Sequence, residues 1–487
     1  MMKLWVKKLA VLATILAILS NIFIFTYPSI HPTSCSWKCP NNPSDTHSGP
    51  NLAVNELSLW DKSIFYFRRY INDILEQFSN SNATDTNGSN NSDQIHLLAF
   101  GDPQIKGIWK NTPYRTRLDI FGNDFYLGHI YSMMQKRLNP SHVAVLGDLF
   151  SSQWIPDDEF FNRTRRYMTR IFNRNSPNLT EIQSQNHDNI GLYQANWKLW
   201  GDQFELLNKT QNFEFGYNDV YSWDPENEDF LFINVTGNHD TGYSGDVTYQ
   251  HLTRFQQFFG KDNYWIEYNN NEKNNEKTWR LVVLNDLLLE GPALQSEFVD
   301  YTWEFLYQLF ERKFNGSTVL LTHIPFYKKE GLCYDGPEFR YYPNGFEREP
   351  YKSGLLRSQN HISEETTNRV LNLIFNSDKP GIILVGHDHV GCEVTYNKNS
   401  STGKWVATKY PLSSDESFNY HVKEVTVRSM MGEFDGNTGL LTGQFNYVKK
   451  QWEWTFSLCP FAVQHFWWCS KVSALLAGFL WSLYLVL

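Results

Sequence analysis

The sequence predicts one large mixed α/β domain with an apolar, membrane-associated segment at each end of the chain. Three observations support this prediction: short apolar runs stop at polar clusters, segments with helical apolar spacing separate the runs, and both chain ends are strongly apolar. Alternation of strand and helix is typical of layered α/β domains. At 487 residues the chain is long for one domain, so we expect one sizeable core with tails.

The N-terminal segment carries three lysines and then an almost entirely apolar stretch from Leu9 to Tyr27. This stretch is long enough to cross a bilayer of about 30 Å at about 1.5 Å per residue. We interpret residues 1–28 as a signal-anchor, because a cleavable signal needs a shorter apolar core and a better cleavage site than Ser34-Cys35. The lysines keep the N-terminus cytosolic and place the rest of the chain in the lumen.

The C-terminal segment, residues 459–487, ends in an apolar run from Val472 to Leu487. Trp467 and Trp468 precede it as an aromatic pair suited to a membrane interface. We expect a second span, although the run is short for one and a re-entrant or lipid-lying segment is the alternative. A removable lipid-anchor signal is disfavoured because the polar spacer is missing.

Residues 29–93 are predicted to form a juxtamembrane region. Within it, residues 57–78 have helical apolar spacing, and residues 79–93 read as a flexible linker rich in Ser, Asn and Asp. The lumenal domain is expected over residues 94–458. A net charge of -9 disfavours a nucleic-acid partner, which would need a basic face.

Glycosylation sequons and cysteines fit a secretory lumen. The sequons begin at Asn82, Asn87, Asn90, Asn162, Asn178, Asn208, Asn234, Asn315 and Asn399. Asn234 lies in an apolar run, so we expect it to be buried and unmodified. Six cysteines are too few for a disulfide-built scaffold. For Cys333 and Cys392, which follow predicted site loops, a bridge and free thiols are both open interpretations.

Several apolar runs end abruptly at side chains that can bind a metal ion. The runs are Ile95–Phe100, His142–Leu146, Phe230–Val235, Thr318–Leu321 and Gly381–Val385. In the same order, the clusters are Asp102-Pro103-Gln104, Gly147-Asp148, Gly237-Asn238-His239-Asp240, Thr322-His323 and Gly386-His387-Asp388-His389. Because α/β sheets bind ligands beyond the carboxyl ends of their strands, the clusters predict one shared site. A sixth run, Trp279–Leu284, ends in Asn285-Asp286, for which a structural role is the commoner interpretation.

Segments with helical apolar spacing lie between these runs, at 124–138, 160–172, 248–259, 294–314 and 363–375. Two polar stretches, 173–223 and 327–361, interrupt the alternation. Loops of that length are usually functional or disordered, and the second follows His323 directly, which makes it a candidate substrate lid. Lys328 and Lys329 at its start could attract phosphate, although such a pair is more often a solvated loop.

The clusters together offer the ligands of a two-metal site. Hydrolysis of a phosphate ester needs a hydroxide-like nucleophile and neutralisation of charge on the phosphoryl oxygens, and two metal ions about 4 Å apart supply both. Such a pair requires a bridging carboxylate together with carboxylate, imidazole and amide ligands. Each cluster alone is weak, since Gly-Asp is often a turn and a lone His is often structural.

In their order along the chain, the clusters resemble those of the calcineurin-like metallophosphoesterase superfamily, over residues 95–435. The resemblance implies a four-layer α/β/β/α sandwich, with flanking membrane segments here, and a dinuclear site at the strand ends. The implied ligands are Asp148 as the bridge, Asp102 and His389 on the first ion, and Asn238, His323 and His387 on the second. His239 is similar to the superfamily's histidine that contacts the phosphate and protonates the leaving oxygen. Its carboxylate partner is not identified, because adjacency does not establish that Asp240 faces the imidazole.

One residue departs from the superfamily pattern, which is usually Asp-x-His in the first motif. Gln104 stands in the His position, so it is either a weak metal ligand or none. Its neutral amide oxygen favours Mn²⁺ or another oxygen-preferring ion over a softer metal.

The variant motif set resembles a narrower group, the GPI-anchor remodelling phosphodiesterases of the early secretory pathway. The resemblance implies a Mn²⁺-dependent enzyme of the endoplasmic reticulum membrane that removes side-chain ethanolamine phosphate from a GPI mannose, and the fungal member acting on the second mannose is the closer match. It implies a GPI glycolipid or GPI-anchored protein as substrate and the cargo-export machinery as a partner. The alternatives are another phosphate ester, such as a nucleotide, phosphoprotein or phospholipid headgroup, and a catalytically silent cargo-binding scaffold.

Overall fold

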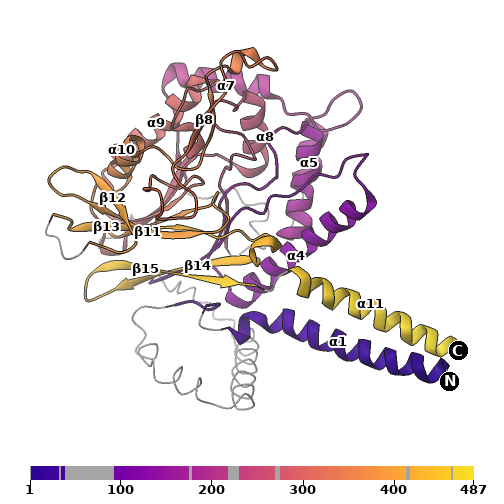
Figure 1. The fold of residues 1–487 in the computed structure, drawn as a ribbon. Helices are drawn as coiled ribbons and strands as arrows, with labels where there is room; N and C mark the ends of the chain where they lie inside the picture. The colour runs from indigo at the N-terminus through magenta and orange to yellow at the C-terminus, as the bar shows by residue number, and fades with distance from the viewer. Residues whose placement is uncertain are drawn as a thin grey trace, which may run out of the picture.

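The computed structural model describes residues 2–31, 34–38, 93–174, 178–217, 230–268, 275–412, 417–461 and 464–487. The predicted helical segment 57–78 and the predicted linker up to residue 92 lie outside these ranges. Within them the fold is mixed α/β with several sheets, which confirms the predicted fold class at that level. Figure 1 traces the chain, with both termini at the free end of a pair of long helices formed by the first and last helices of the chain, which we call the hairpin.

The first sheet has five strands in the order β15-β14-β1-β2-β4. They are β1 (Gln94–Phe100), β2 (His142–Val145), β4 (Leu231–Asn234), β14 (Asn437–Asn446) and β15 (Gln451–Pro460). β1, β2 and β4 run parallel, so their carboxyl ends meet at one edge, whereas β14 and β15 are antiparallel to their neighbours.

The second sheet has eight strands in the order β12-β11-β13-β10-β7-β6-β5-β3. They are β3 (Gly216–Tyr217), β5 (Tyr264–Tyr268), β6 (Trp279–Val283), β7 (Ser317–Leu321), β10 (Gly381–Val385), β11 (Cys392–Lys398), β12 (Trp405–Thr408) and β13 (Tyr420–Thr426). β6, β7, β10 and β13 are parallel neighbours. All six apolar runs therefore form strands, and Trp279–Val283 lies between β5 and β7.

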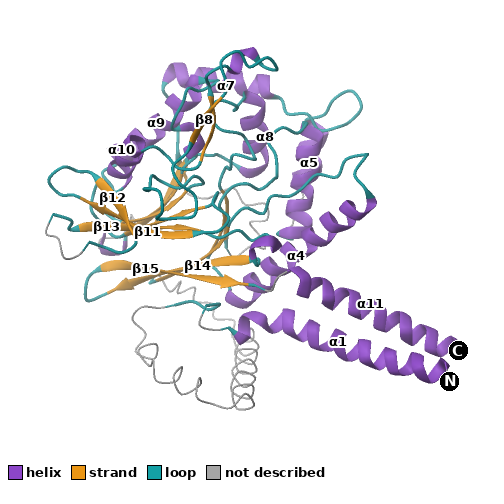
Figure 2. Ribbon diagram, viewed as in Figure 1, coloured by secondary structure: helices purple, strands orange, loops and turns teal. Residues whose placement is uncertain are grey.

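The two sheets pack face to face over a shared apolar core. Leu97 of β1 and Leu146 after β2 contribute from the first sheet, and Leu281 of β6, Leu321 of β7 and Leu384 of β10 contribute from the second. These five side chains are almost fully buried. Because the strands are apolar on both faces, each sheet also buries its outer face, and Figure 2 shows helices covering those faces.

Helices cover both outer faces. On the first sheet these are α4 (Tyr114–Leu138), α5 (Asp157–Arg166), the π-helix η1 (Tyr167–Ile171) and α8 (Tyr249–Phe259). On the second they are α7 (Trp197–Thr210), α9 (Ser296–Glu311) and α10 (Glu364–Ile374). The remaining elements are α6 (Asn178–Gln185) and the short helices η2 (Asn275–Lys277), η3 (Asp286–Leu288), η4 (Pro350–Lys352) and η5 (Gly432–Phe434).

Both long polar stretches contain regular structure. Within residues 173–223 lie α6, α7 and β3, and α7 buries Phe204. Within residues 327–361, β8 (Phe339–Tyr341) pairs with β9 (Leu356–Gln359) as a separate two-stranded ribbon. The expectation of plain loops was wrong there, because alternating polar and apolar positions in short elements give a weak periodic signal.

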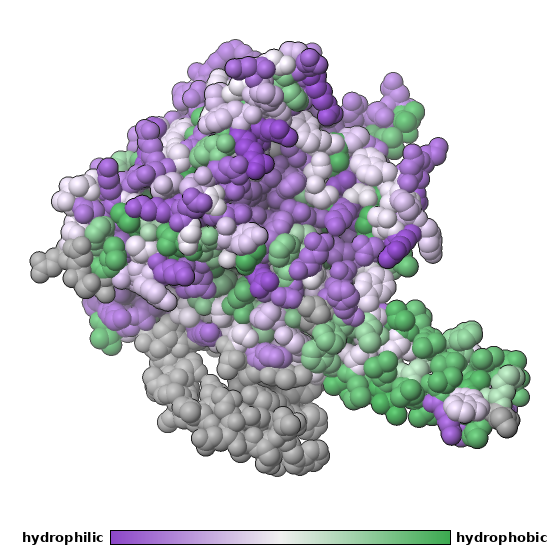
Figure 3. Space-filling view, viewed as in Figure 1, coloured by the Kyte–Doolittle hydropathy of each residue, from purple (hydrophilic) through white to green (hydrophobic). Residues whose placement is uncertain are grey.

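The chain ends form two long apolar helices, α1 (Met2–Ile30) and α11 (Gln464–Val486), which lie side by side. By length and composition each could cross a membrane. α11 begins eight residues before the predicted apolar run, at Gln464 rather than Val472, so its length is no obstacle to a span. Figure 3 shows the pair as an apolar projection from a largely polar body. These features indicate a membrane protein.

Interhelical and domain contacts hold this pair in place. Asn21 donates from its side chain to the Ser470 carbonyl at 3.3 Å, and the Trp481 indole donates to Thr14 at 2.9 Å. Trp467 is buried rather than facing a membrane interface, so that part of the expectation was wrong: its ring meets Tyr126 of α4 with centroids 6.3 Å apart.

Two disulfides connect distant segments of the described chain. Cys35 pairs with Cys459 and joins the end of α1 to β15. Cys333 pairs with Cys392 and joins the loop after β7 to β11. Of the two open interpretations for these cysteines, the bridge is confirmed. Of the described cysteines, Cys469 is free.

Candidate metal centre

Sharp backbone turns carry the predicted ligands out of the strands. Asp102, Gln104, Asp148 and His387 all have positive φ, at 45°, 42°, 48° and 72°. Non-glycine residues adopt this left-handed conformation rarely, and such strain clusters at functional sites. The turns aim the side chains back over the ends of β1, β2 and β10.

Glycines allow these turns to touch one another. A Cβ atom on Gly237 would lie 1.9 Å from the backbone nitrogen of Asp148, so a side chain there would collide with the neighbouring turn. A Cβ atom on Gly386 would lie 2.4 Å from the Leu146 carbonyl oxygen. The Gly-Asn-His-Asp and Gly-His-x-His patterns thus need glycine for close approach between turns.

A buried group of Asp102, Asp148 and His323 could hold a metal ion, because ligand atoms of the three lie within 4.8 Å of one another. Oδ1 of Asp102 accepts a hydrogen bond from the backbone N–H of His387 at 3.1 Å. Its Oδ2 is buried and has no hydrogen-bond partner among the described residues. An orphaned buried carboxylate oxygen is costly unless a cation binds it, so the donor set fits a metal.

Four atoms that could bind a metal lie close together here. Nδ1 of His323 donates to the Leu146 carbonyl at 2.8 Å, which leaves Nε2 as an acceptor. Oδ1 of Asn238 lies 3.0 Å from that Nε2, and Oδ1 of Asp148 lies 3.4 Å from it. Nδ1 of His387 lies 3.0 Å from the same Asn238 oxygen. Burial lowers the pKa of His323 and so favours its neutral form, in which no proton lies between Nε2 and the two oxygens. A cation would join these three atoms.

Asp148 occupies the middle of the arrangement. Its Oδ1 accepts a hydrogen bond from the backbone N–H of His239 at 2.8 Å, and its Oδ2 lies 3.1 Å from Nε2 of Gln104. Nε2 of His239 lies 3.8 Å from Oδ2, and the His239 side chain is 38% exposed. His239 is therefore partly open to solvent and to a substrate.

Gln104 and His389 meet on the other side of Asp148. Nε2 of Gln104 lies 3.2 Å from Nε2 of His389. The structure thus brings together every residue predicted for the site, including the one in the variant position.

Burial and neighbouring charges shift the pKa values of the cluster. Burial raises the pKa of Asp102 well above its ordinary value, and the nearby charge of Asp148 raises it further. Burial also acts to raise the pKa of Asp148, but His323 and His239 lower it below its ordinary value overall. Burial lowers the pKa of His387 to about 3. Burial also lowers the pKa values of His323 and His389, so it favours the neutral form of these three imidazoles, which is the form that binds metals.

Two buried aspartates support the turns that carry the ligands. For Asp286 a structural role was the commoner expectation, and for Asp240 the partner was left open. Asp240 accepts hydrogen bonds from the backbone of Phe150 and Gly237, so it faces away from His239. Asp286 accepts one from the backbone of Ile324 at 2.9 Å, which steadies the turn that carries His323. Both follow apolar runs in the sequence, but only their contacts reveal their roles.

Lys328 is neither solvated nor free to attract phosphate, so both sequence interpretations were wrong for it. The side chain is 1% exposed and its Nζ lies 2.6 Å from Oε1 of the buried Glu424. Glu424 also accepts a hydrogen bond from the backbone of Phe326 at 3.1 Å. Lys329, its neighbour, is exposed.

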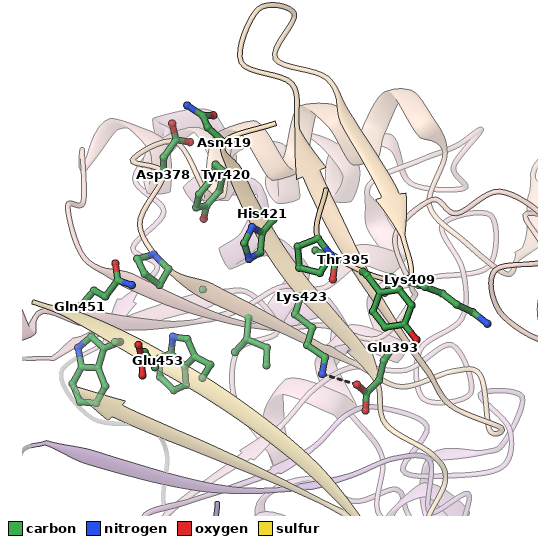
Figure 4. Close-up of a pocket in the computed structure, with 18 residues that line it drawn as sticks. Asp378, Glu393, Thr395, Lys409, Asn419, Tyr420, His421, Lys423, Gln451 and Glu453 are labelled. Carbon is green, nitrogen blue, oxygen red and sulfur yellow. Dashed lines mark ion pairs between the residues drawn. The ribbon is translucent and has the colours of Figure 1, made fainter. Parts of the chain in front are cut away.

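A separate hollow of about 650 Å³ lies at the amino ends of β10, β13 and β15 (Figure 4). Its lining includes Tyr420, Lys423 and Trp454. β10 begins there and ends at the ligand-bearing turn, so the hollow lies at the other end of the strands and contains no predicted site residue.

Fold and site define a mixed α/β protein with two apolar terminal helices and a buried carboxylate–imidazole cluster at its strand ends. Protein TED1 of Saccharomyces cerevisiae is 58% identical to this chain over 492 residues, which cover 99% of each protein. The chain therefore belongs to the family of Protein TED1.

More distant comparisons add less. Uncharacterized protein C23A1.02c of Schizosaccharomyces pombe is 26% identical over 378 residues, covering 71% of this chain and 68% of its own length. GAP50, the anchor in the inner membrane complex of Plasmodium, is 11% identical with a TM-score of 0.34, covering 76% of this chain and 89% of that chain. This TM-score is too low to support a conclusion about the fold or function of the chain. No protein-family profile matches the chain.

Proposed function

We propose that this protein is a metal-dependent phosphodiesterase of the calcineurin-like metallophosphoesterase superfamily. The observation that carries the proposal is the buried convergence of Asp102, Asp148 and His323, with an orphaned carboxylate oxygen and opposed lone pairs. The packing of two sheets between helical layers supports assignment to the α/β/β/α sandwich of that superfamily.

Two divalent ions would activate a water and neutralise phosphoryl charge when bound. Mn²⁺ is our choice because Gln104 offers a neutral amide oxygen where the superfamily usually has an imidazole. Asp148 would contact both ions. Asp102 and His389, with Gln104 as a weak neighbour, would hold one, and Asn238, His323 and His387 the other. His239, half-exposed at the rim, is suited to contact a phosphate oxygen and to give a proton to the leaving oxygen.

The substrate we propose is side-chain ethanolamine phosphate on a mannose of GPI anchors, removed at the endoplasmic reticulum membrane with the catalytic domain in the lumen. The support is the motif resemblance, the lysine-flanked N-terminal helix and the two disulfides, since disulfides persist in oxidising compartments. GPI-anchored proteins that become ready for export after this trimming would link the enzyme to cargo export.

Metal content and hydrolysis of the purified full-length protein test the proposal. We expect near two equivalents of metal, and release of ethanolamine phosphate from GPI glycans that carry it but no product from glycans that lack it. Asp148→Asn should lose metal and abolish release, and His389→Ala should do the same. His187→Ala, an exposed histidine outside the cluster, is the matched control and should behave as the parent.

Different failures point to different errors. Bound metal with hydrolysis of other phosphate esters but not of GPI glycans would keep the chemistry and reject the substrate. Absence of metal and of hydrolysis, with the chain folded, would reject the enzyme and favour a binding scaffold.

A further inference from the structure

An exposed apolar stripe runs along α4 beside the terminal helices. Tyr114, Leu118, Phe121 and Phe125 are 82%, 49%, 47% and 40% exposed. Their spacing of four, three and four residues places them on one face of the helix. Four large apolar side chains on one solvent-facing stripe are unusual for a soluble surface and mark a contact site. We call these four residues the α4 stripe.

The α4 stripe continues into the contact between α4 and the terminal helices. One residue beyond Phe121, a Cβ atom on Gly122 would lie 1.8 Å from the Trp468 ring of α11. Further along α4, the His129 ring lies 4.7 Å from the Phe25 ring of α1. In Figure 1, α11 leaves the domain directly beside α4. The stripe therefore lies next to the level at which the apolar hairpin emerges.

Cationic side chains accompany the α4 stripe. The Arg170 guanidinium lies 5.8 Å from the centroid of the Phe121 ring and 5.9 Å from that of Phe125. Arg115, next to Tyr114, is exposed. Asp119, next to Leu118, is an exposed acidic residue beside the stripe. Aromatic and aliphatic side chains flanked by arginines are the composition of helices that lie in a membrane interface.

The α4 stripe and the hairpin cannot move independently. The Cys35–Cys459 disulfide joins the end of α1 to the domain, and the Trp37 indole donates to the carbonyl of Leu138, the last residue of α4, at 2.8 Å. The Arg166 guanidinium lies 2.7 Å from the buried carboxylate of Asp124 on α4. An inserted hairpin would therefore fix which face of the domain meets the bilayer.

The metal centre is tied to the same body. The segment that leaves Gln104 toward α4 is held by arginines of α5: Arg163 donates to the Ile105 carbonyl at 3.1 Å, and Arg166 to the Lys106 carbonyl at 2.7 Å. The orientation of α4 at a membrane thus also sets the orientation of the centre.

We infer that the α4 stripe rests in the lipid headgroup region as a second membrane contact beside the α1–α11 hairpin. The inference rests on the proposed insertion of the hairpin but not on the proposed chemistry. The bilayer surface is favoured over a protein partner because the stripe is continuous with the contact between α4 and the terminal helices. Its flanking arginines can also bind the phosphate groups of lipid headgroups.

Site-directed fluorescence tests this contact. The full-length protein, with Cys39 and Cys469 replaced by Ser, is labelled with an environment-sensitive fluorophore at Leu118→Cys. It is reconstituted into phosphatidylcholine–phosphatidylserine vesicles with or without doxyl-labelled lipid. We expect doxyl lipid to quench the fluorophore at position 118. We expect soluble iodide to quench it less than it quenches the same fluorophore on a model peptide in water.

Two labelled controls bracket the measurement. Leu475→Cys on α11, 76% exposed, reports insertion and should be quenched by doxyl lipid. Leu206→Cys on α7, 62% exposed, should be quenched by iodide alone. If 475 is quenched by doxyl lipid and 118 behaves like 206, the α4 stripe faces water or a protein and the inference is wrong. If 475 is not quenched either, insertion itself is wrong and the inference falls with it, while hydrolysis by the protein would be unaffected.

Discussion

The buried carboxylate of Asp240 accepts a hydrogen bond from the backbone N–H of Phe150 at 3.1 Å. Its other oxygen accepts one from Gly237 at 2.8 Å. Phe150 lies two residues after Asp148, and Gly237 lies one before Asn238. A single side chain therefore clamps together the two turns that carry a carboxylate and an amide ligand.

Removing this clamp should destabilise the domain and weaken metal binding. Asp240→Ala leaves two buried N–H groups without an acceptor, at a cost of about 1–3 kcal/mol each. We expect a clear fall in the unfolding midpoint of the full-length protein in detergent, and loss of metal during dialysis. Asp202→Ala, an exposed aspartate of α7, is the control and should change neither. An Asp240→Ala protein as stable as the parent would contradict the clamp.

Gln104 should be the residue that tunes metal preference. Its amide nitrogen lies 3.1 Å from Asp148 and 3.2 Å from His389, so a ligand atom at this position would face the centre. Gln104→His supplies a softer nitrogen ligand, and we expect stronger retention of Zn²⁺ relative to Mn²⁺ after dialysis against a chelator, measured by elemental analysis. Gln104→Ala is the matched comparison. Equal retention in parent, His and Ala proteins would mean that position 104 does not contact metal.

The buried pair of Lys328 and Glu424 should be needed for stability rather than for substrate binding. Lys328→Met leaves the Glu424 carboxylate buried and unpaired, and breaking such a pair costs about 3–5 kcal/mol. The double variant Lys328→Met/Glu424→Gln should recover much of the loss, and Lys329→Met should unfold like the parent. Thermal unfolding separates these outcomes. A Lys328→Met protein of parental stability but raised KM would restore the phosphate role.

Buried His142 should make the domain less stable in acid. Burial lowers its pKa to about 4 in the folded protein, against about 6.5 in the unfolded chain. The unfolded state therefore binds the extra proton between these values, so the stability due to neutral His142 is complete above pH 6.5 and is lost as the pH falls toward 4. The contribution is at most about 3 kcal/mol.

Denaturant unfolding at several pH values checks this expectation. The parent should lose stability from pH 7 to pH 5, and His142→Gln should show a shallower dependence. His187→Gln, at an exposed position, should keep the parental slope. An unchanged slope in His142→Gln would show that other groups carry the acid sensitivity.

Local patterns in the sequence were sufficient for much of the fold. The apolar runs formed strands, and the helical segments formed helices within a few residues, for example Ser363–Phe375 as Glu364–Ile374. The exception in length was α4, which begins at Tyr114 rather than Asp124. Its first turns combine polar residues with exposed apolar ones, so they lack the buried apolar face from which a helix is predicted. Asn234 is buried as expected, at 5% exposure, and its side chain accepts a hydrogen bond from Tyr167.

The sequence by itself determined which residues could form a site, because parallel strands bring their carboxyl ends to one edge whatever separates them along the chain. Only the tertiary structure decided where each side chain points. Asp240 accepts hydrogen bonds from two backbone N–H groups and does not face His239. Lys328 is buried beside Glu424, and Trp467 packs against α4. These choices depend on contacts between residues far apart in sequence, whose energies no local periodicity records.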